Sequence, residues 1–277
     1  QHLRSREEGL PTHILHLWSA TAEAPSYDAA QRAGLLSLLF LEQALLQTSG
    51  GSEGPAIRIG VVTAGAHEVV EGDRVIPARA TVLGASKVIH QESRQLTCAS
   101  IDVALPAPGS PGEERLIGQL LAEMEVPEAE LEPAVAYRGR QRWVRTFGPV
   151  RVPEVSERGG ASRLRPDGAY LITDGAHAVG VALARALAGG GAKVAVVLPA
   201  DAATEEPWGE RGIVVLRADL TDPESLAGAL TKARNRFGGL DGVLHTAAPF
   251  TGGLIQLKTP EALDASLRPV ARGAEAL

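Results

Sequence analysis

The chain has 277 residues, with 27 Lys plus Arg against 33 Asp plus Glu, so its formal net charge is −6. This mildly acidic balance lacks the basic excess that attracts a nucleic-acid backbone, so we expect no nucleic-acid partner. Hydrophobic residues make up 44% of the chain and charged residues 22%, which is the usage of an ordinary globular protein with a buried core.

No apolar stretch reaches the roughly 18 uninterrupted residues that a membrane span needs. Even the most apolar segment, 178–198, carries Arg185 and Lys193. The single cysteine, Cys98, excludes an internal disulfide and a cysteine-rich zinc site. We therefore expect a cytoplasmic protein without a membrane partner, in which Cys98 is a buried small hydrophobic residue.

The first half alternates predicted strands and helices. A strand is predicted at 14–18, followed by a helix with a broad apolar face at 28–48, for which Asp28 is the candidate N-cap. Further along, strands are predicted at 57–63 and 97–104, helices at 78–92 and 113–125, and a hairpin at 134–147. This alternation indicates an α/β half.

A segment without apolar periodicity separates the two halves. Residues 151–167 are rich in Pro, Gly, Ser and charged residues. Such a composition is typical of a linker, which predicts a first domain at 1–150 and a second at 168–277.

The second half repeats the alternation at a regular spacing. Strands are predicted at 169–173, 193–198, 213–216 and 242–246, and helices at 178–188, 222–236 and 260–277. This spacing predicts a parallel, doubly wound sheet with right-handed crossovers. A four-stranded sheet of this kind leaves a long edge bare, so we expect either that the polypeptide continues past Leu277 or that another segment covers the edge.

Two short segments resemble each other. Residues 62–67 read Val-Thr-Ala-Gly-Ala-His and residues 172–177 read Ile-Thr-Asp-Gly-Ala-His, each at the end of a predicted strand. The similarity fits a duplication of one Rossmann-like half, and it fits chance equally well.

The turn after the strand at 169–173 has the position of a dinucleotide-binding turn. There, glycines let a pyrophosphate approach the backbone at the start of the next helix. Short-chain reductases have Thr-Gly-x-x-x-Gly-x-Gly, whereas this turn has Asp174 and Ala178 at two of the glycine positions and keeps Gly180. Because Asp174 adds a carboxylate that repels phosphate, we expect weak or no dinucleotide binding. The residues of this degenerate site are Thr173, Asp174, Gly175, Ala178 and Gly180.

The residues expected to contact the ribose are acidic. NADP enzymes place an arginine after the second strand of the fold, and NAD enzymes an acidic residue. Here the strand at 193–198 is followed by Asp201, Glu205 and Glu206, with no basic residue before Arg211. Such a loop would repel a 2′-phosphate. Asp201 leaves open a contact to the ribose of NAD, and a solvated acidic loop is the alternative.

No catalytic or metal-binding residue emerges from the pattern. A short-chain reductase needs a tyrosine with Lys or Asn four residues later, but Tyr27, Tyr137 and Tyr170 are followed there by Gln or Asp. His13 and His16 are three apart on a predicted strand and therefore point to opposite faces. The G-x-S-x-G letters at 50–54 follow a predicted helix in a loop, where a flexible turn is the simpler interpretation.

Over nearly its whole length the sequence resembles the ketoreductase region of modular polyketide synthases. The resembling strings lie at 16–18, 38–45, 61–66, 80–92, 96–103, 137–145, 170–173, 218–222 and 240–248. The resemblance implies two Rossmann-like halves: a structural subdomain, and the start of a catalytic subdomain whose incomplete sheet is of the short-chain dehydrogenase/reductase type. It also implies NADPH as the cofactor of active members and places an adenine-contacting aspartate at Asp219.

Departures from the family pattern coincide with its functional positions. The family's Leu-x-Pro-Lys-Val-x-Gly string corresponds to 267–273, where Val270 takes the place of the lysine. Ala248 replaces a glycine expected against the cofactor. The family's catalytic Ser, Tyr and Asn would follow Leu277, so the resemblance carries over no catalytic residue.

These departures predict a non-catalytic, structural ketoreductase region that scaffolds neighbouring domains such as a methyltransferase, a dehydratase or an acyl-carrier protein, without a cofactor or a metal. The alternative is the N-terminal part of an active NADPH-dependent β-ketoacyl ketoreductase. A third interpretation, a binding module that uses the crevice for another ligand, rests on the fold alone.

Overall fold

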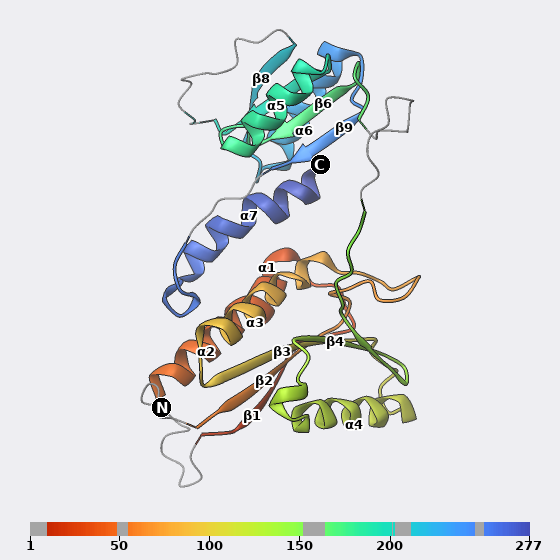
Figure 1. Cartoon of the computed structure of the whole chain (residues 1–277), viewed down its shortest axis with the longest axis vertical. Coiled ribbons are helices and arrows are strands. Elements are labelled where there is room, and N and C mark those ends of the chain that lie inside the picture. Colours follow the sequence, from red (N-terminus) through yellow and green to blue (C-terminus); the bar gives the residue numbers. More distant parts are fainter. Residues whose placement is uncertain (1–9, 49–54, 152–163, 201, 203–211, 247–251) are drawn as a thin grey trace. The chain divides into compact units, whose positions relative to one another are not determined.

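The computed structural model describes residues 10–48, 55–151, 164–200, 202, 212–246 and 252–277. The chain forms two compact units (Figure 1). The first unit comprises Gln1–Pro149 and Gly253–Lys258, and the second comprises Val150–Gly252 and Thr259–Leu277. Most of the predicted linker, 152–163, and the loop at 50–54 lie outside the described residues. Among the described residues, no helix combines the length and the apolar composition that crossing a membrane requires.

The sheet of the first unit has its strands in sequential order, β1-β2-β3-β4-β5. Neighbours from β1 to β4 are parallel, and β5 pairs antiparallel with β4 in the predicted hairpin. The strands are β1 (His13–Ser19), β2 (Ile57–Thr63), β3 (Leu96–Val103), β4 (Ala134–Arg138) and β5 (Gln141–Val144). Cys98 is buried in β3, which confirms its predicted place in the core.

The predicted helix at 28–48 is one continuous helical segment. It consists of α1 (Tyr27–Ala30), a π-helical stretch (Gln31–Leu36) and α2 (Ser37–Thr48). The prediction of Asp28 as N-cap was wrong. Ser26 is the N-cap, because its backbone is extended and its hydroxyl accepts a hydrogen bond from the Ala29 N–H, whereas Asp28 already lies inside the first turn.

The remaining helices of the first unit cover both faces of the sheet. They are α3 (Thr81–Glu92), preceded by a 3₁₀ turn (Pro77–Arg79), and α4 (Pro111–Glu125), followed by a 3₁₀ turn (Glu128–Glu130). Figure 1 shows α2 and α3 on one face and α4 on the other. Leu120 of α4 packs against Val62, Ile101 and Val135. The chain therefore leaves the adjacent strands β2 and β3 toward opposite faces, and such a divergence opens a crevice at the carboxyl ends of parallel strands.

The sheet of the second unit has the order β8-β7-β6-β9, and all its pairings are parallel. The strands are β6 (Ala169–Thr173), β7 (Lys193–Leu198), β8 (Ile213–Arg217) and β9 (Gly242–His245). β6 is buried along its whole length, and so is β7 apart from Lys193. The predicted α/β fold with a doubly wound parallel sheet is confirmed.

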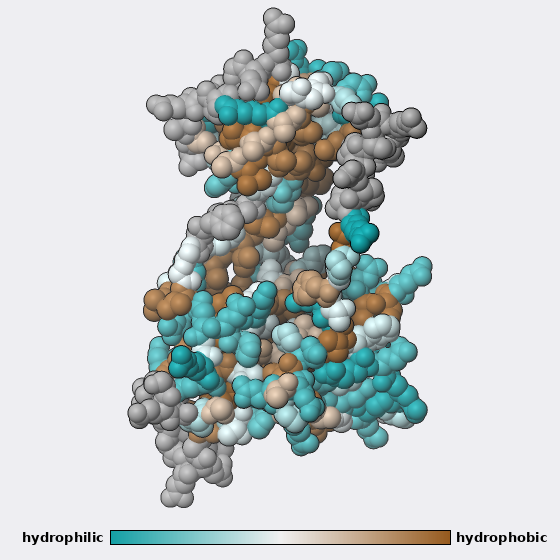
Figure 2. All heavy atoms as spheres, in the orientation of Figure 1, coloured by the Kyte–Doolittle hydropathy of each residue, from teal (hydrophilic) through white to brown (hydrophobic). Residues whose placement is uncertain are grey.

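Helices cover both faces of this second sheet. They are α5 (Ala178–Gly189), α6 (Pro223–Phe237) and α7 (Pro260–Ala276). Ala184 and Leu187 of α5 pack with Val196 on one face, while Leu226 of α6 and Ala276 of α7 pack on the other. Apolar side chains gather on the visible side of the second unit, where Figure 1 places α5 (Figure 2).

A short segment of the C-terminal part packs on the helices of the first unit. It contains the 3₁₀ turn Ile255–Leu257, in which Ile255 is buried. The Ile255 N–H donates to a Glu92 carboxylate oxygen at 2.8 Å, and the Gln43 side chain donates to the carbonyls of Gln256 and Lys258. This segment, Gly253–Lys258, lies within the predicted second domain in sequence but groups with the first unit in space.

Candidate functional site

The candidate site lies at the carboxyl ends of β6 and β9. These adjacent parallel strands lead to α5 and α7 on opposite faces of the sheet, which makes this edge the switch point where doubly wound folds bind ligands. The Thr173 hydroxyl lies 2.7 Å from Nδ1 of His245 and accepts a hydrogen bond from the Thr246 N–H at 3.2 Å. The strand ends are therefore held together by side chains as well as by the sheet.

The two glycines that remain in the turn are required by packing. A Cβ at Gly175 would overlap Cγ1 of the buried Val196 on β7. A Cβ at Gly180 would lie 2.9 Å from the Asp174 carbonyl oxygen and 2.9 Å from Cα of Gly175. Close packing of the helix against the strand is the role of the last glycine in a dinucleotide-binding turn, the position that Gly180 occupies, whereas Gly175 lies at a position where the motif does not require glycine.

Asp174 occupies the position at which the sequence pattern predicts a glycine, and its backbone is left-handed, with φ 54°. No other described non-glycine residue has a positive φ. Glycine adopts this conformation without steric cost, and aspartate is among the few other residues that tolerate it. The turn has thus kept a backbone shape that suits glycine while it carries a side chain.

The Asp174 side chain is buried beside the start of α5. One carboxylate oxygen lies 3.0 Å from Nδ1 of His177, the N-cap residue of that helix, and the other is buried without a hydrogen-bond partner among the described residues. His177 provides no side-chain cap for the helix. A helix N-terminus favours a nearby negative charge. At the start of α5 the Asp174 carboxylate occupies that place. The residues of the turn therefore do not fit the diphosphate of a dinucleotide.

Val270, at the family's lysine position, contributes a backbone group to the site. Its carbonyl oxygen accepts a hydrogen bond from Nε2 of His245 at 3.0 Å. Both ring nitrogens of His245 are thus engaged, one with Thr173 and one with α7. A Cβ at Gly273 would lie 2.8 Å from the His245 ring, so this glycine is needed for the approach of α7. This arrangement joins α7 to β9. The Val270 side chain is apolar, so it supplies no ammonium group at the position where the family has a lysine.

Arg217 is a basic residue near the ribose position that the sequence analysis missed. It ends β8, pairs in register with Leu198 of β7, and donates hydrogen bonds to the carbonyls of Pro199 at 3.1 Å and Ala202 at 3.0 Å. The sequence pattern points only to the loop that follows β7, whereas this guanidinium reaches the same place from the neighbouring strand. The parallel pairing of the two predicted strands was the signal that could have found it. Asp201 and 203–211 lie outside the described residues.

The Asp219 side chain makes hydrogen bonds within a local turn. Its Oδ1 accepts hydrogen bonds from the Thr221 N–H at 2.8 Å and the Thr221 hydroxyl at 2.7 Å. The hydrogen bond from the hydroxyl, followed by that from the backbone N–H, lowers the pKa of Asp219 below its ordinary value. This geometry shapes the chain before α6. In the described part of the chain, no three His, Cys, Asp or Glu side chains come together as metal ligands do.

Residues 168–277 match the family model described as "KR domain". The chain is 25% identical over 271 residues to a phenolphthiocerol/phthiocerol polyketide synthase protein of Mycobacterium tuberculosis, covering 94% of this chain and 14% of that protein. It is 30% identical over 275 residues to polyketide synthase GfsE of Streptomyces halstedii, covering 90% of this chain and 7% of that protein. Residues 168–277 therefore belong to the KR domain family, within a chain that is similar to polyketide synthases over most of its length.

One solved structure is similar to this chain over both of its units. The first ketoreductase of the tylosin polyketide synthase aligns with a TM-score of 0.72 and 25% identity, over 95% of this chain and 53% of that one. The KR match covers the second unit's sheet and begins just before β6. The chain spans only 14% of the length of the first of these relatives and 7% of the length of the second.

Proposed function

We propose that this ketoreductase region is catalytically silent and acts as a structural part of a modular polyketide synthase. The observation that carries the proposal is the buried carboxylate of Asp174, paired with the N-cap residue of α5 where a cofactor diphosphate would sit. A charge-assisted hydrogen bond contributes about 1.5–3 kcal/mol. Replacing phosphate contacts in the turn by repulsion therefore removes several kcal/mol of binding free energy.

In this role the region packs beside working domains. We assign residues 1–150 as the structural subdomain, 151–167 as the linker and 168–277 as the catalytic-type subdomain of a cytoplasmic synthase. Its neighbours would be a methyltransferase, a dehydratase or an acyl-carrier protein. Support for such neighbours is that the similar curated proteins are polyketide synthases many times longer than this chain.

The test is a fluorescence titration of the full chain with NADPH. We expect no saturable binding up to about 1 mM, because binding at that level already corresponds to only about 4 kcal/mol. Asp174→Gly removes the carboxylate and keeps the left-handed backbone, and we expect it to tighten binding at least about tenfold, or by about 1.4 kcal/mol. Micromolar binding by the unaltered chain would overturn the proposal.

A matched variant separates the two effects of the aspartate. Asp174→Asn tolerates a positive φ and has nearly the same size but no charge. If charge repulsion dominates, Asp174→Asn recovers most of the affinity gained by Asp174→Gly. If the volume of the side chain dominates, only the glycine variant gains affinity.

Arg217 favours a second candidate function, the N-terminal part of an active NADPH-dependent β-ketoacyl ketoreductase. Its guanidinium lies at the carboxyl end of β7, where NADP enzymes contact the 2′-phosphate. Under this function the unaltered chain binds NADPH more tightly than NADH, and Arg217→Gln abolishes that preference. Equal, weak responses to both nucleotides would exclude it.

A further inference from the structure

The first unit has a cavity of its own at the carboxyl edge of its sheet. The cavity has a volume of about 290 Å³. Its walls come from the ends of β2, β3 and β4, from the segment that follows β1, and from the segment that precedes α3; they include Thr21, Gly65, Arg74, Arg79, Leu105 and Arg138. The site described above lies in the second unit, so this cavity is separate from it.

The topology explains why a cavity forms at this edge. The connection from β2 leads to α3 on one face of the sheet, and the connection from the adjacent β3 leads to α4 on the opposite face (Figure 1). The two connections therefore diverge at the carboxyl ends of these strands. Ligands of open α/β sheets bind in crevices of this kind. Both units thus carry a switch point, and the two similar hexapeptides, 62–67 and 172–177, begin at the end of the first diverging strand in each.

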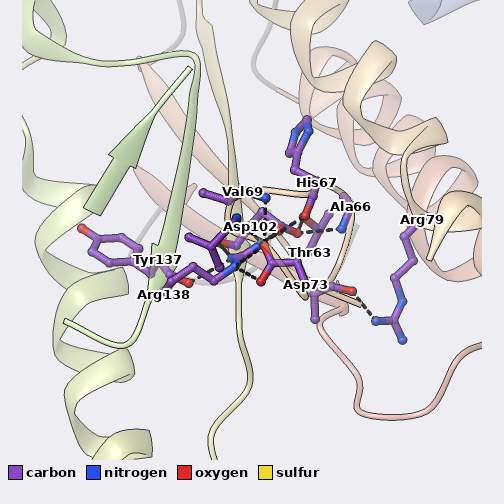
Figure 3. Close-up of polar contacts among 11 residues, drawn as sticks. Thr63, Ala66, His67, Val69, Asp73, Arg79, Asp102, Tyr137 and Arg138 are labelled. Carbon is purple, nitrogen blue, oxygen red and sulfur yellow. Dashed lines mark hydrogen bonds and ion pairs between the residues drawn. The ribbon is translucent and has the colours of Figure 1, made fainter. Parts of the chain in front are cut away.

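Arg138 closes one wall of the cavity and has no capacity left for a ligand. Its Nη2 lies 2.7 Å from an Asp102 carboxylate oxygen and its Nε lies 2.9 Å from Asp73 (Figure 3). It also donates to the carbonyls of Asp102, Tyr137 and His67. The other Asp102 oxygen accepts from the Thr63 hydroxyl and the Ala66 N–H. Every group in this cluster is satisfied within the fold.

Arg79 differs from Arg138 because its hydrogen-bond partners are neutral. It is 3% exposed, and its guanidinium donates to the Ala64 carbonyl at 2.5 Å, to the Thr21 hydroxyl at 2.7 Å and to the Glu23 carbonyl. Its Nε is buried without a hydrogen-bond partner among the described residues. Burial, followed by the positive charge of Arg74, lowers the pKa of Arg79 below its ordinary value. A buried cation with an unused donor and a second cation nearby is a site for an anion.

We propose that this crevice binds a small organic anion through Arg79 and Arg74. Three guanidinium groups line or border the cavity against the two carboxylates of Asp73 and Asp102, which leaves the surroundings net positive. Ile76, Val103 and Leu105 provide apolar walls for the body of the ligand. The volume suits a molecule of a few carbon atoms with one carboxylate or phosphate group. The proposal is independent of whether the second unit binds a nucleotide.

The experiment titrates the ¹⁵N-labelled full chain and follows the arginine Nε–H signals by NMR. The probes are sodium phosphate and sodium butyrate, with sodium chloride at matched ionic strength as the control. The Arg79→Lys variant identifies the Arg79 signal by its loss. We expect that signal to shift saturably with at least one of the two probes and to remain unchanged with chloride. The probe with the smaller dissociation constant identifies the anionic group.

Three variants test the site without relying on Arg79. Arg74→Gln changes an exposed residue of the cavity wall, and we expect it to weaken binding about tenfold. Leu105→Trp fills the cavity from its exposed rim and should abolish binding. Arg140→Gln removes an exposed arginine of the β4–β5 turn, outside the cavity, and should leave binding unchanged. Shifts that stay linear up to about 20 mM, or an unaltered dissociation constant in both Arg74→Gln and Leu105→Trp, would overturn the proposal.

Discussion

Glu42 is a carboxylic acid that the first unit buries on α2. It is 1% exposed, and one of its carboxylate oxygens has no hydrogen-bond partner among the described residues. Burial, followed by the negative charge of Glu92, raises the pKa of Glu42 from 4.5 to about 7. The folded chain therefore holds this proton more tightly than the unfolded chain.

We expect the stability of the chain to fall as the pH rises from about 4.5 through about 7, because the contribution of the protonated Glu42 is complete below its unfolded pKa and is lost above its folded pKa. Glu42→Gln remains neutral at every pH, so urea unfolding at pH 5 and pH 8 should show a smaller difference. At pH 8 the variant should be more stable than the unaltered chain by on the order of 1–3 kcal/mol. Glu125→Gln, at an exposed position of α4, is the control that should keep the pH dependence.

Asp174 shows how far sequence can lead at the scale of a single residue. Its position in the turn and its departure from glycine were visible in the sequence. Its left-handed backbone and its pairing with His177 were not, because both depend on how the turn packs against β7. Arg217 was missed for a related reason: a residue distant in sequence reached the site through strand pairing.

At the scale of the elements, the predicted strands and helices of both halves are confirmed, with ends that shift by a few residues. Regular alternation, capping residues and short loops made these elements visible in the sequence. The π-helical stretch Gln31–Leu36 was not predicted. Hydrogen bonds in a π-helix span one residue more than in an α-helix, and no residue type in the sequence marks where such a stretch occurs.

Two glycines, Gly175 in the turn before α5 and Gly189 at the last position of α5, should respond differently to the same substitution. A Cβ at Gly175 would overlap the buried Val196, so we expect Gly175→Ala to lower the free energy of unfolding by about 1–3 kcal/mol. Gly189→Ala adds a methyl group where no heavy atom lies within 4 Å and should be neutral or stabilise by up to about 1 kcal/mol. Thermal unfolding of both variants checks the difference, and equal losses would contradict it.

The ion pairs at the carboxyl ends of β2, β3 and β4 should be costly to break. Arg138→Met leaves the buried Asp102 without its cationic partner, and we expect a loss of about 3–5 kcal/mol in urea unfolding. Arg140→Gln, two residues away in the exposed turn, should change stability by less than about 0.5 kcal/mol. A loss below about 1 kcal/mol in Arg138→Met would show that the cluster contributes little to the fold.

At the scale of the whole molecule, sequence predicted two α/β halves but not how each sheet is ordered. The second sheet follows the doubly wound order, whereas the first is sequential. Alternating strands and helices are compatible with both orders, because the alternation does not determine which strands become neighbours in the sheet. The docking of Gly253–Lys258 on the first unit was also invisible, since it depends on hydrogen bonds from Gln43 and to Glu92 across long sequence separations.

Ile255 provides a test of that docking. Because it is buried against α2 and α3, we expect Ile255→Ala to destabilise the first unit by about 1–3 kcal/mol. Hydrogen exchange should quicken at amides of α2 and α3 and stay unchanged in β6 and β7. Leu257→Ala, at a side chain that is 75% exposed, is the matched control and should leave exchange unaltered throughout. Faster exchange in β6 and β7 would show that the effect is not local to the first unit.

The polypeptide crosses between the two units more than once. The chain passes from one unit to the other after Pro149, after Gly252 and after Lys258. If the backbone were cut anywhere in 152–163, the downstream piece would still carry Ile255 and its neighbours, which pack on the upstream piece. We therefore expect the two pieces to stay associated after such a cut, as the fragments of a split protein do, because the Ile255 segment of the downstream piece packs on the upstream piece.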